Sequence, residues 1–579
     1  MDSAFYELSG WLQTEGASLA STLCTVWRYL APVLAIVLLW RCAKPMVRFR
    51  REPETWAWLV MPDGQQLPIT HWENIIGRAK SSDIIVNFPT ISRNHAVLTR
   101  YDDGSWSITE IGSRGSVLVN GKKTSVSAIQ YGDIISLGGV EVMLAPTTAE
   151  ELEEQQYNRT RPNEVSWPSL TLLLLTLFQL FTVAQLWTSC KPENAATILF
   201  SFGALIGLQW LLFCVLRMLR RSGFDVETLA FFLTTMGLAV IASSDASALM
   251  KQVICVAGGI VIYLVVSWSL RDLNRAKVFR YLAAVAGIGL LAVNLVFGRE
   301  AYGAKNWIDF GAFSFQPSEL VKICFLYVGA STMDRIVSKR NIITFIIYSV
   351  IVCGFLALMS DFGTALIFFV AFLVIAYLRS GSFATIGLAC TATGFAGAVA
   401  ASLKPYILRR FSGWGHVWEH PYDSLGYQQT RAMMCIASGG LLGLGAGNGW
   451  LKYVAAADTD LVFAFVSEEW GLIIAITLVC AIVVLGVFVL RSCAVGRSSF
   501  YTIGACAAVA IFMTQTILNV FGTMDLLPLT GVTFPFLSNG GSSMLSSWGL
   551  LAFIKAADTR QNASLAVKTV QPEEVEPDE

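Results

Sequence analysis

A lysine that could do chemistry, Lys322, lies inside an apolar segment that begins near Pro317, directly after the polar stretch KNWIDFGAFSFQPSE. Proline suits the first turn of a helix, because the N–H that it lacks has no helical partner there. Helical side chains point back toward the N-terminus, so Lys322 leans toward the polar stretch. Two interpretations stay open. Lys322 either reaches the membrane surface or pairs with Glu319, or its ammonium faces a wet functional cavity.

Four carboxylates surround the start of a second apolar segment. Asp458 and Asp460 precede this segment, and Glu468 and Glu469 lie about two helical turns inside it. Aspartates at the start of a helix commonly cap it, so capping is the alternative for either one. Carboxylates buried two turns deep need a cation or another polar partner, and groups of this kind mark catalytic sites or transport paths within membranes.

Composition places these groups in an integral membrane protein. The 579 residues are 54% apolar and only 14% charged, whereas soluble domains carry about 25% charged residues. The net charge of zero gives no indication of a nucleic-acid partner. The 12 cysteines include no CxxC pair and are expected to be small buried apolar side chains. The histidines are too dispersed for a zinc cluster, and His416 with His420 is a weak metal candidate.

The hydropathy pattern predicts about 13 membrane helices. The run near 30–40 is expected to be a retained anchor, because no basic region typical of a signal peptide precedes it. The later segments are expected near 168–187, 197–216, 227–243, 250–270, 279–298, 317–332, 343–359, 362–378, 383–402, 461–490, 502–522 and 542–557. Basic residues are concentrated in alternate connections, which predicts an outside N-terminus and an inside C-terminus. The polar loops at 305–316, 404–460 and 524–543 then converge outside.

A region of different character separates the anchor from the membrane body. Short alternating segments such as DIIVNF, AVLTRY and SVLVNG predict a small all-β sandwich on the cytoplasmic side. The predicted organisation is 1–52 for the outer N-terminus, anchor and basic segment, 53–147 for the sandwich, 148–167 for an acidic linker, 168–222 for two extra helices, 223–557 for the membrane domain and 558–579 for an acidic disordered tail.

Five motifs, in order over residues 224–557, resemble the SEDS family (shape, elongation, division and sporulation), the membrane glycosyltransferases typified by RodA and FtsW. They are NWIDFGAFSFQPSELVK, SDFGTALI, GYQQTRAMMCIASGGLLGLGAGNG, DTDLVFAFVSEEWG and PLTGVTFPFLSNGGSS. The resemblance implies a polytopic helical fold of ten SEDS helices, here with three extra. It also implies polymerisation of lipid II, the lipid-linked disaccharide-pentapeptide, into glycan strands at the outer face of the bacterial cytoplasmic membrane.

By motif, Asp460 matches the essential outer aspartate of the family and Lys322 matches the lysine that pairs with it. A β-1,4 bond formed from an α-linked diphosphate donor requires inversion, and hence a base for the acceptor hydroxyl and positive charge for the diphosphate. We hypothesise that Asp460 is the base and that Lys322 holds it ionised. Arg409, Arg410 and Arg431 are candidates for diphosphate binding, alongside a divalent cation (Mg²⁺ or Mn²⁺). The other candidate substrate contacts are Trp307, Gln316, Ser318, Glu319, Gln428, Asp458 and Glu468.

The chain departs from the family pattern at several motif positions. Asp458 stands where the family has histidine, and Asn539 stands in place of a tyrosine. Arg431 and Ala432 replace the usual Gln-Ser. We expect Asp458 to raise the pKa of Asp460 or to help hold a cation. The departures concern the details of substrate contact rather than the class of reaction.

The all-β region resembles a forkhead-associated (FHA) domain, an eleven-strand sandwich that recognises phosphothreonine peptides. Its marks are Gly77-Arg78, Ser92-Arg93 with His95, and Asn120-Gly121. By motif, Arg78 and Ser92 would contact phosphate, with Arg93 and Arg114 as further candidates and His95 bracing the loop. Gly115 and Ser116 replace the usual Asn-Gly, so a docking module without phosphate recognition is the alternative.

The leading hypothesis is a peptidoglycan glycosyltransferase of elongation or division that is regulated through a phosphoprotein. The resemblance also implies a class B penicillin-binding transpeptidase as partner. The rival hypothesis is a lipid II flippase, because Lys322, Glu468 and Glu469 would also suit a transport path. A phosphosignalling receptor with a degenerate membrane body is the third, and the presence of both Asp460 and Lys322 disfavours it.

Overall fold

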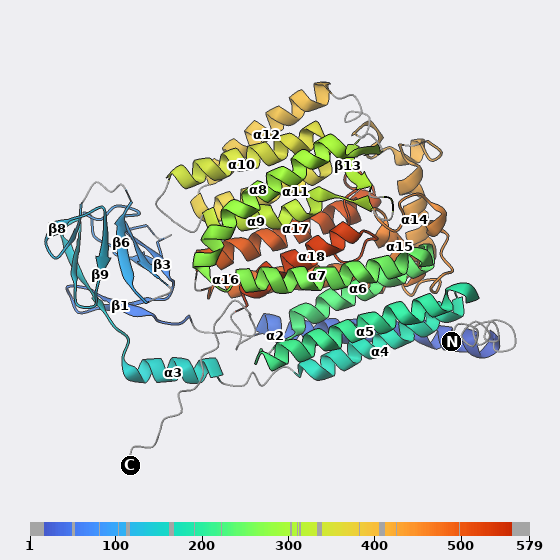
Figure 1. The fold of residues 1–579 in the computed structure, drawn as a ribbon, viewed down its shortest axis with the longest axis horizontal. Coiled ribbons are helices and arrows are strands. Elements are labelled where there is room, and N and C mark those ends of the chain that lie inside the picture. Colours follow the sequence, from blue (N-terminus) through green and yellow to red (C-terminus); the bar gives the residue numbers. More distant parts are fainter. Residues whose placement is uncertain are drawn as a thin grey trace, which may run out of the picture.

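The computed structural model describes residues 17–48, 53–79, 82–101, 104–111, 116–160, 167–189, 191–221, 223–301, 304–309, 311, 314–332, 339–380, 383–403, 411–423, 425–496 and 498–558. A helical body and a small β-sandwich make up these residues (Figure 1).

The helical body consists of long apolar helices. Its long helices are α2 (Ala17–Arg48), α4 (Pro168–Ser189), α5 (Ala195–Met218), α6 (Asp225–Ser244), α7 (Leu249–Ser269), α8 (Leu273–Phe297), α9 (Pro317–Thr332), α10 (Lys339–Leu358), α11 (Phe362–Ser380), α12 (Phe383–Leu403), α16 (Leu472–Cys493), α17 (Ser499–Thr523) and α18 (Gly541–Ala556). In the described part of the chain, 10 helices are long and apolar enough to cross a membrane. The protein is therefore a multi-pass helical membrane protein, and α9 and α18, with 16 residues each, are shorter than the usual span.

The centre of the body is α6, which is buried on nearly all of its surface. Next to it, α18 packs against α7, α9 and α17. Trp548 of α18 is fully buried, and its ring contacts those of Phe231, Tyr263 and Phe536. Both helices carry polar side chains that find partners inside the bundle, such as Glu227 of α6 with Tyr263 and Ser546 of α18 with Glu319.

The three helices that precede this core pack onto it as a group. α2 contacts α4 and α16, while α4 contacts α5 and α6. Gln179 of α4 and Gln209 of α5 exchange two amide hydrogen bonds of 2.9 Å, and Gln179 also donates to Thr235 of α6 at 3.0 Å. All of these side chains are buried, and amides in apolar surroundings require such partners. The pair fixes the register of α4 and α5 on α6.

The prediction of one continuous helix over 461–490 is wrong. The segment forms two helices, α15 (Val462–Glu469) and α16, separated at Trp470 and Gly471. Gly471 has a φ of +91°, and a Cβ there would lie 2.4 Å from the carbonyl oxygen of Leu441. The chain of the glycine-rich run passes so close to the break that only glycine fits. Glu468 and Glu469 therefore lie at the end of a short helix, not two turns inside a long one.

The small domain is a sandwich of two sheets, as expected. One sheet has the strand order β2-β1-β11-β10-β7-β8 and the other β4-β3-β5-β6-β9. The strands are β1 (Ala57–Val60), β2 (Gln66–Ile69), β3 (Glu73–Gly77), β4 (Ile84–Ile85), β5 (Ala96–Arg100), β6 (Trp106–Glu110), β7 (Val117–Val119), β8 (Lys122–Lys123), β9 (Val126–Ile129), β10 (Ile134–Leu137) and β11 (Val140–Ala145). Alternate side chains such as Leu59, Ile76, Leu98 and Ile135 form the core between the sheets.

The acidic linker contains a helix, α3 (Ala149–Thr160), which was not predicted. Its start is a capping box. The N–H of Glu151 donates to Thr148 Oγ1 at 3.3 Å, and the N–H of Thr148 donates to Glu151 Oε2 at 3.0 Å. The same carboxylate accepts the indole N–H of Trp58 at 3.1 Å. The linker is thus attached to the sandwich.

The sandwich lies at one end of the helical body, and α14 (Tyr427–Gly439), α15 and β13 (Ala304–Asp309) lie at the opposite end (Figure 1). The sandwich contacts the connection between α16 and α17. The ring Nδ1 of His71 is 2.7 Å from the carbonyl oxygen of Gly496, and Ser499 donates a hydrogen bond to the carboxylate of Glu73.

Candidate functional site

The polar stretch before Lys322 forms a small antiparallel sheet. Its strands are β12 (Arg299–Ala301), β13 and β14 (Ser314–Phe315). Trp307 is half-buried in β13, opposite Arg299. The helix α9 begins at Pro317, which confirms the predicted start.

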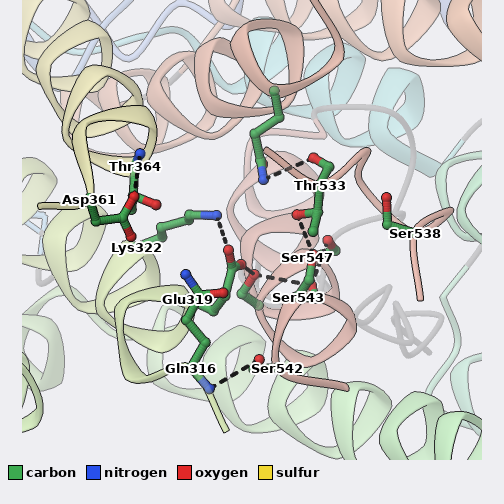
Figure 2. Close-up of polar contacts among 12 residues, drawn as sticks. Gln316, Glu319, Lys322, Asp361, Thr364, Thr533, Ser538, Ser542, Ser543 and Ser547 are labelled. Atoms are coloured by element: carbon green, nitrogen blue, oxygen red, sulfur yellow. Dashed lines mark hydrogen bonds and ion pairs between the residues drawn. The ribbon is translucent and has the colours of Figure 1, made fainter. Parts of the chain in front are cut away.

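Lys322 is buried at 1% exposure, and its ammonium donates to Glu319 Oε1 at 2.7 Å. The other carboxylate oxygen of Glu319 accepts from Ser546 Oγ of α18 at 2.7 Å. Figure 2 shows the ammonium directed at Glu319, beside the serine-rich start of α18. The i,i+3 alternative raised from the sequence is thus present in the fold. The expected pairing of Lys322 with Asp460 stays a prediction.

The SDFGTALI motif supplies a further carboxylate that the sequence reasoning did not assign. Asp361 is 8% exposed and stands just before α11, where its Oδ1 accepts the N–H of Thr364 at 3.1 Å. Its Oδ2 has no hydrogen-bond partner in the described part of the chain, and its charge interacts with those of Lys322 and Glu319. The sequence signal that could have identified Asp361 is its position directly before an apolar helix, where an aspartate commonly caps the helix start.

Gln316 and Ser318 flank the start of α9. The backbone N–H of Gln316 donates to Ser542 Oγ at 3.3 Å, which ties β14 to α18 (Figure 2). Ser318 is fully buried, and its hydroxyl has no partner among the residues that the structure describes. These contacts bring the first polar loop and the start of α18 together.

Asp460 lies in the loop that ends at α15, against the PLTGVTFPF motif. Its carbonyl accepts from Asn519 Nδ2 of α17 at 3.0 Å, and the same amide donates to the carbonyl of Val532 at 2.9 Å. Gly531 has a φ of +70°, and a Cβ there would lie 3.3 Å from Asp460 Oδ2. Glycine therefore leaves the space beside this carboxylate open. The predicted convergence of the second and third polar loops is confirmed by these contacts.

Two residues before Asp460, the carboxylate of Asp458 is tied to another loop. Asp458 Oδ2 accepts from Asn539 Nδ2 at 2.7 Å and from Ser244 Oγ of α6 at 3.3 Å. The backbone N–H of Asn539 also donates to the carbonyl of Asp458, at 2.8 Å. The sequence pointed to neither partner, because they lie on distant segments.

Glu468 and Glu469 hold the glycine-rich run in place. Glu468, at 2% exposure, accepts the N–H groups of Trp450 at 2.8 Å and Leu451 at 2.9 Å. Glu469 accepts the N–H of Gly449 at 3.4 Å. Backbone N–H groups thus provide the polar partners that two buried carboxylates require. The bonds commit Glu468 to the loop, and a substrate contact for it stays a prediction.

Two candidates from the long 404–460 connection lie on α14. Gln428 donates to the carbonyl of Ala455 at 2.9 Å and so reaches the loop before Asp458. The guanidinium of Arg431 stacks near the rings of Tyr427 and Tyr422, with 5.3 and 5.8 Å to their centroids. Arg409 and Arg410 lie outside the described residues.

The donor set does not form a complete cation site of its own. Among the residues that the structure describes, no group of three or more His, Cys, Asp or Glu side chains could hold a metal ion. Asp458 and Asp460 provide two carboxylates, and Oδ2 of Asp458 already accepts two hydrogen bonds. A divalent cation would need most of its oxygen ligands from elsewhere.

Two of the three FHA marks, Gly77-Arg78 and Ser92-Arg93 with His95, meet in the sandwich, whereas Asn120 bonds Asp133 and Ile134. A Cβ on Gly77 would lie 2.1 Å from the carbonyl oxygen of Arg93, so glycine permits the approach of two loops. The N–H of Arg78 donates to the carbonyl of Ser92 at 3.0 Å, and the side chains of Arg78 and Arg93 are exposed. His95 is fully buried, and its Nδ1 accepts the N–H of Ser92 at 3.1 Å, as the bracing role predicts. Arg114 and Gly115 lie outside the described residues.

The architecture defines the class of protein. It is a multi-pass helical membrane protein with a carboxylate site in the loops at one end of the helical body and a β-sandwich at the other end (Figure 1). The family model of the cell cycle proteins FtsW, RodA and SpoVE matches residues 225–563, and the FHA domain model matches residues 74–138. The chain therefore belongs to the FtsW/RodA/SpoVE family and carries an FHA domain.

Individual relatives agree with this assignment. The probable peptidoglycan glycosyltransferase FtsW of Wigglesworthia glossinidia brevipalpis is 31% identical over 301 residues, which is 49% of this chain and 77% of that protein. The peptidoglycan glycosyltransferase RodA of Mycobacterium tuberculosis H37Rv is 29% identical over 326 residues, 52% of this chain and 69% of that protein. A solved chain from a peptidoglycan synthase complex aligns with a TM-score of 0.49 at 24% identity, covering 58% of this chain and 98% of that chain. This TM-score by itself does not establish a shared fold.

Proposed function

We propose that this protein is a peptidoglycan glycosyltransferase that polymerises lipid II at the outer face of the bacterial cytoplasmic membrane. The observation that carries the proposal is the position of Asp460. This aspartate lies on a loop fixed by α17 and by the 531–539 loop, in a chain that belongs to the FtsW/RodA/SpoVE family. Relatives of the chain are named as enzymes of this activity.

The reaction is one inverting displacement. The carboxylate of Asp460 accepts the proton of the acceptor 4-hydroxyl as that oxygen attacks the anomeric carbon of the donor. The bond from this carbon to the diphosphate oxygen breaks, and the diphosphate departs with the electron pair. Positive charge from Arg431, with Arg409 and Arg410 on the same outer loop, stabilises the leaving group. Every step of this scheme uses the protein side chains and the two substrates, without a divalent cation.

Lys322 has a supporting role in this scheme. Its ammonium joins Glu319 and, through that carboxylate, Ser546, so it links α9 to α18 beside the outer loops. Burial raises the pKa of the nearby Asp361 carboxyl, and the charge of Lys322 opposes that rise. We propose that Lys322 pairs with Asp460 when substrate is bound.

The membrane arrangement follows from the same proposal. α9, α12 and α18 join the ten long helices to give thirteen spans, with the N-terminus outside and the sandwich and C-terminus in the cytoplasm. A class B penicillin-binding transpeptidase would crosslink the strands. The FHA domain would bind a phosphothreonine protein through Arg78 and Ser92.

The test is polymerisation of purified lipid II by the full-length protein in liposomes, with and without the transpeptidase. Asp460→Ala and Asp460→Asn should abolish glycan product, whereas Asp423→Asn, an exposed aspartate of the outer loop, should retain it. Product from the Asp460 variants would refute the assignment of the base. Transfer of lipid II between leaflets without glycan product would instead identify a flippase.

A further inference from the structure

Three hydrogen bonds between described residues join the loop that carries Asp460 to the 531–539 loop. Ser538 Oγ donates to the carbonyl of Thr459 at 2.6 Å. The N–H of Asn539 donates to the carbonyl of Asp458 at 2.8 Å, and Asn539 Nδ2 donates to Asp458 Oδ2 at 2.7 Å. Only the last bond joins two side chains.

Those two side chains stand at two of the positions at which this chain departs from the pattern of its family. Asp458 stands in place of the histidine that precedes Thr-Asp, and Asn539 stands in place of the tyrosine before Gly-Gly. The positions are 81 residues apart in sequence, yet the side chains are direct partners. An ionised carboxylate can only accept hydrogen bonds, and the amide NH2 of asparagine can donate one to it. The two departures are therefore complementary.

We propose that Asp458 and Asn539 act as a coupled positioning pair that sets the location of the Asp460 carboxylate against the 531–539 loop. This inference rests on the proposed function of Asp460. It assigns Asp458 to positioning rather than to proton transfer or cation binding. Ser244 Oγ, which also donates to Asp458 Oδ2, fixes the pair to α6.

The hydrogen bonds of Asp458 fit a positioning carboxylate. Asp458 Oδ2 accepts two hydrogen bonds, and the residue is partly buried. An amide nitrogen in the place of Asp458 Oδ2 could donate one hydrogen to a carboxylate at position 539 and the other to Ser244 Oγ, whose own hydrogen can go to the carbonyl of Ile241. Exchanging the two residues thus reverses the donor and the acceptor while it keeps the bond.

The experiment is a double-mutant cycle on the full-length protein, measuring kcat for lipid II polymerisation and the apparent Tm. Asn539→Asp should lower kcat by about tenfold or more, because two carboxylates then face each other. The double variant Asp458→Asn/Asn539→Asp should return kcat to within about threefold of wild type. The coupling in kcat is expected within about 2- to 150-fold, the usual range for residues in direct contact.

Two controls give the cycle its specificity. Asn448→Asp makes the same change at an exposed asparagine on the same outer face and should leave kcat unchanged. The pH profile adds a readout that a merely structural role would not move. For Asn539→Asp, kcat relative to wild type should rise as the pH falls, since protonation of either carboxylate restores a hydrogen bond between the pair.

Failure of the inference is distinguishable from failure of the proposed function. If wild type polymerises lipid II but the double variant is no better than Asn539→Asp alone, the pair is refuted. Loss of all product in Asp458→Asn, with its Tm unchanged, would assign Asp458 to the chemistry instead. If wild type makes no product, the proposed function and the positioning role both fail, and recovery of Tm in the double variant still decides whether the two side chains are partners.

Discussion

The Lys322–Glu319 pair gives a prediction that separates a structural role from a chemical one. Lys322 is 1% exposed and Glu319 4%, with 2.7 Å between the ammonium and the carboxylate. Replacing Lys322 with Met would leave the Glu319 carboxylate buried with Ser546 Oγ as its remaining donor. Removing one partner of a buried ion pair costs about 3–5 kcal/mol. We therefore expect Lys322→Met to lower the apparent Tm markedly.

The double variant Lys322→Met/Glu319→Gln should recover most of that stability. A neutral amide at 319 can still accept from Ser546, and no buried charge remains. Replacing both members of a buried pair is often close to neutral. Polymerisation should nevertheless stay low in the double variant, because the positive charge beside the site is gone. The assay is Tm by intrinsic fluorescence in detergent, together with glycan synthesis in liposomes.

An exposed ion pair provides the matched control. Arg299 and Asp309 lie 3.1 Å apart on the small β12–β13 sheet, with side-chain exposures of 76% and 44%. Arg299→Met should cost no more than about 1 kcal/mol. A wild-type Tm in Lys322→Met would refute the argument from burial. Full activity in the double variant would show that Lys322 has only a structural role.

Three further outcomes are expected. Arg78→Ala should weaken binding of a phosphothreonine peptide at least tenfold, measured by fluorescence anisotropy against the unphosphorylated peptide, and equal binding of the two peptides by wild type would favour a plain docking module. Burial lowers the pKa of His95 below its usual 6.5, so the unfolded sandwich binds the proton more readily. The stability of the sandwich in urea should therefore fall as the pH drops below about 6.5, and His95→Gln should flatten that dependence. Gly443→Ala should destabilise the protein by well over about 1–3 kcal/mol, because Gly443 has a φ of +81° and a Cβ there would lie 2.3 Å from the carbonyl of Glu469, whereas Gly207→Ala, with nothing within 4 Å, should leave Tm unchanged.

The sequence was sufficient for the elements whose signal is local. Apolar length predicted the long helices, alternation predicted the sandwich, and Pro317 marked the start of α9. The break between α15 and α16 was missed because residues on both sides of it are apolar. Only the φ of Gly471 and the close passage of Leu441, neither visible in hydropathy, require it. The strands β12 to β14 were missed because the polar stretch that forms them has no regular alternation.

Partners at the site were harder to predict than the residues themselves. Asp460, Lys322 and Glu468 were recognisable as candidates, because charged groups near apolar segments are costly and need a reason. The partner of Lys322 could be named only as one of two alternatives, since helical geometry gives a direction and not a distance. Ser244 and Asn539 could not be assigned to Asp458 at all, because their meeting depends on the packing of α6 against two loops.

The hydrogen bonds that hold the loops around Asp460 explain how motif positions can change while these loops keep their places. Asn519 binds the carbonyls of Asp460 and Val532, Ser538 binds the carbonyl of Thr459, and Glu468 binds two N–H groups of the glycine-rich run. Each of these side chains hydrogen-bonds to a backbone group, and such a bond does not depend on the side chain at the partner position. The side-chain bond between Asp458 and Asn539 is different, because each partner demands a particular chemistry of the other. A change at either position is tolerable only with a matching change at its partner, so coupling in the mutant cycle should concentrate at this pair.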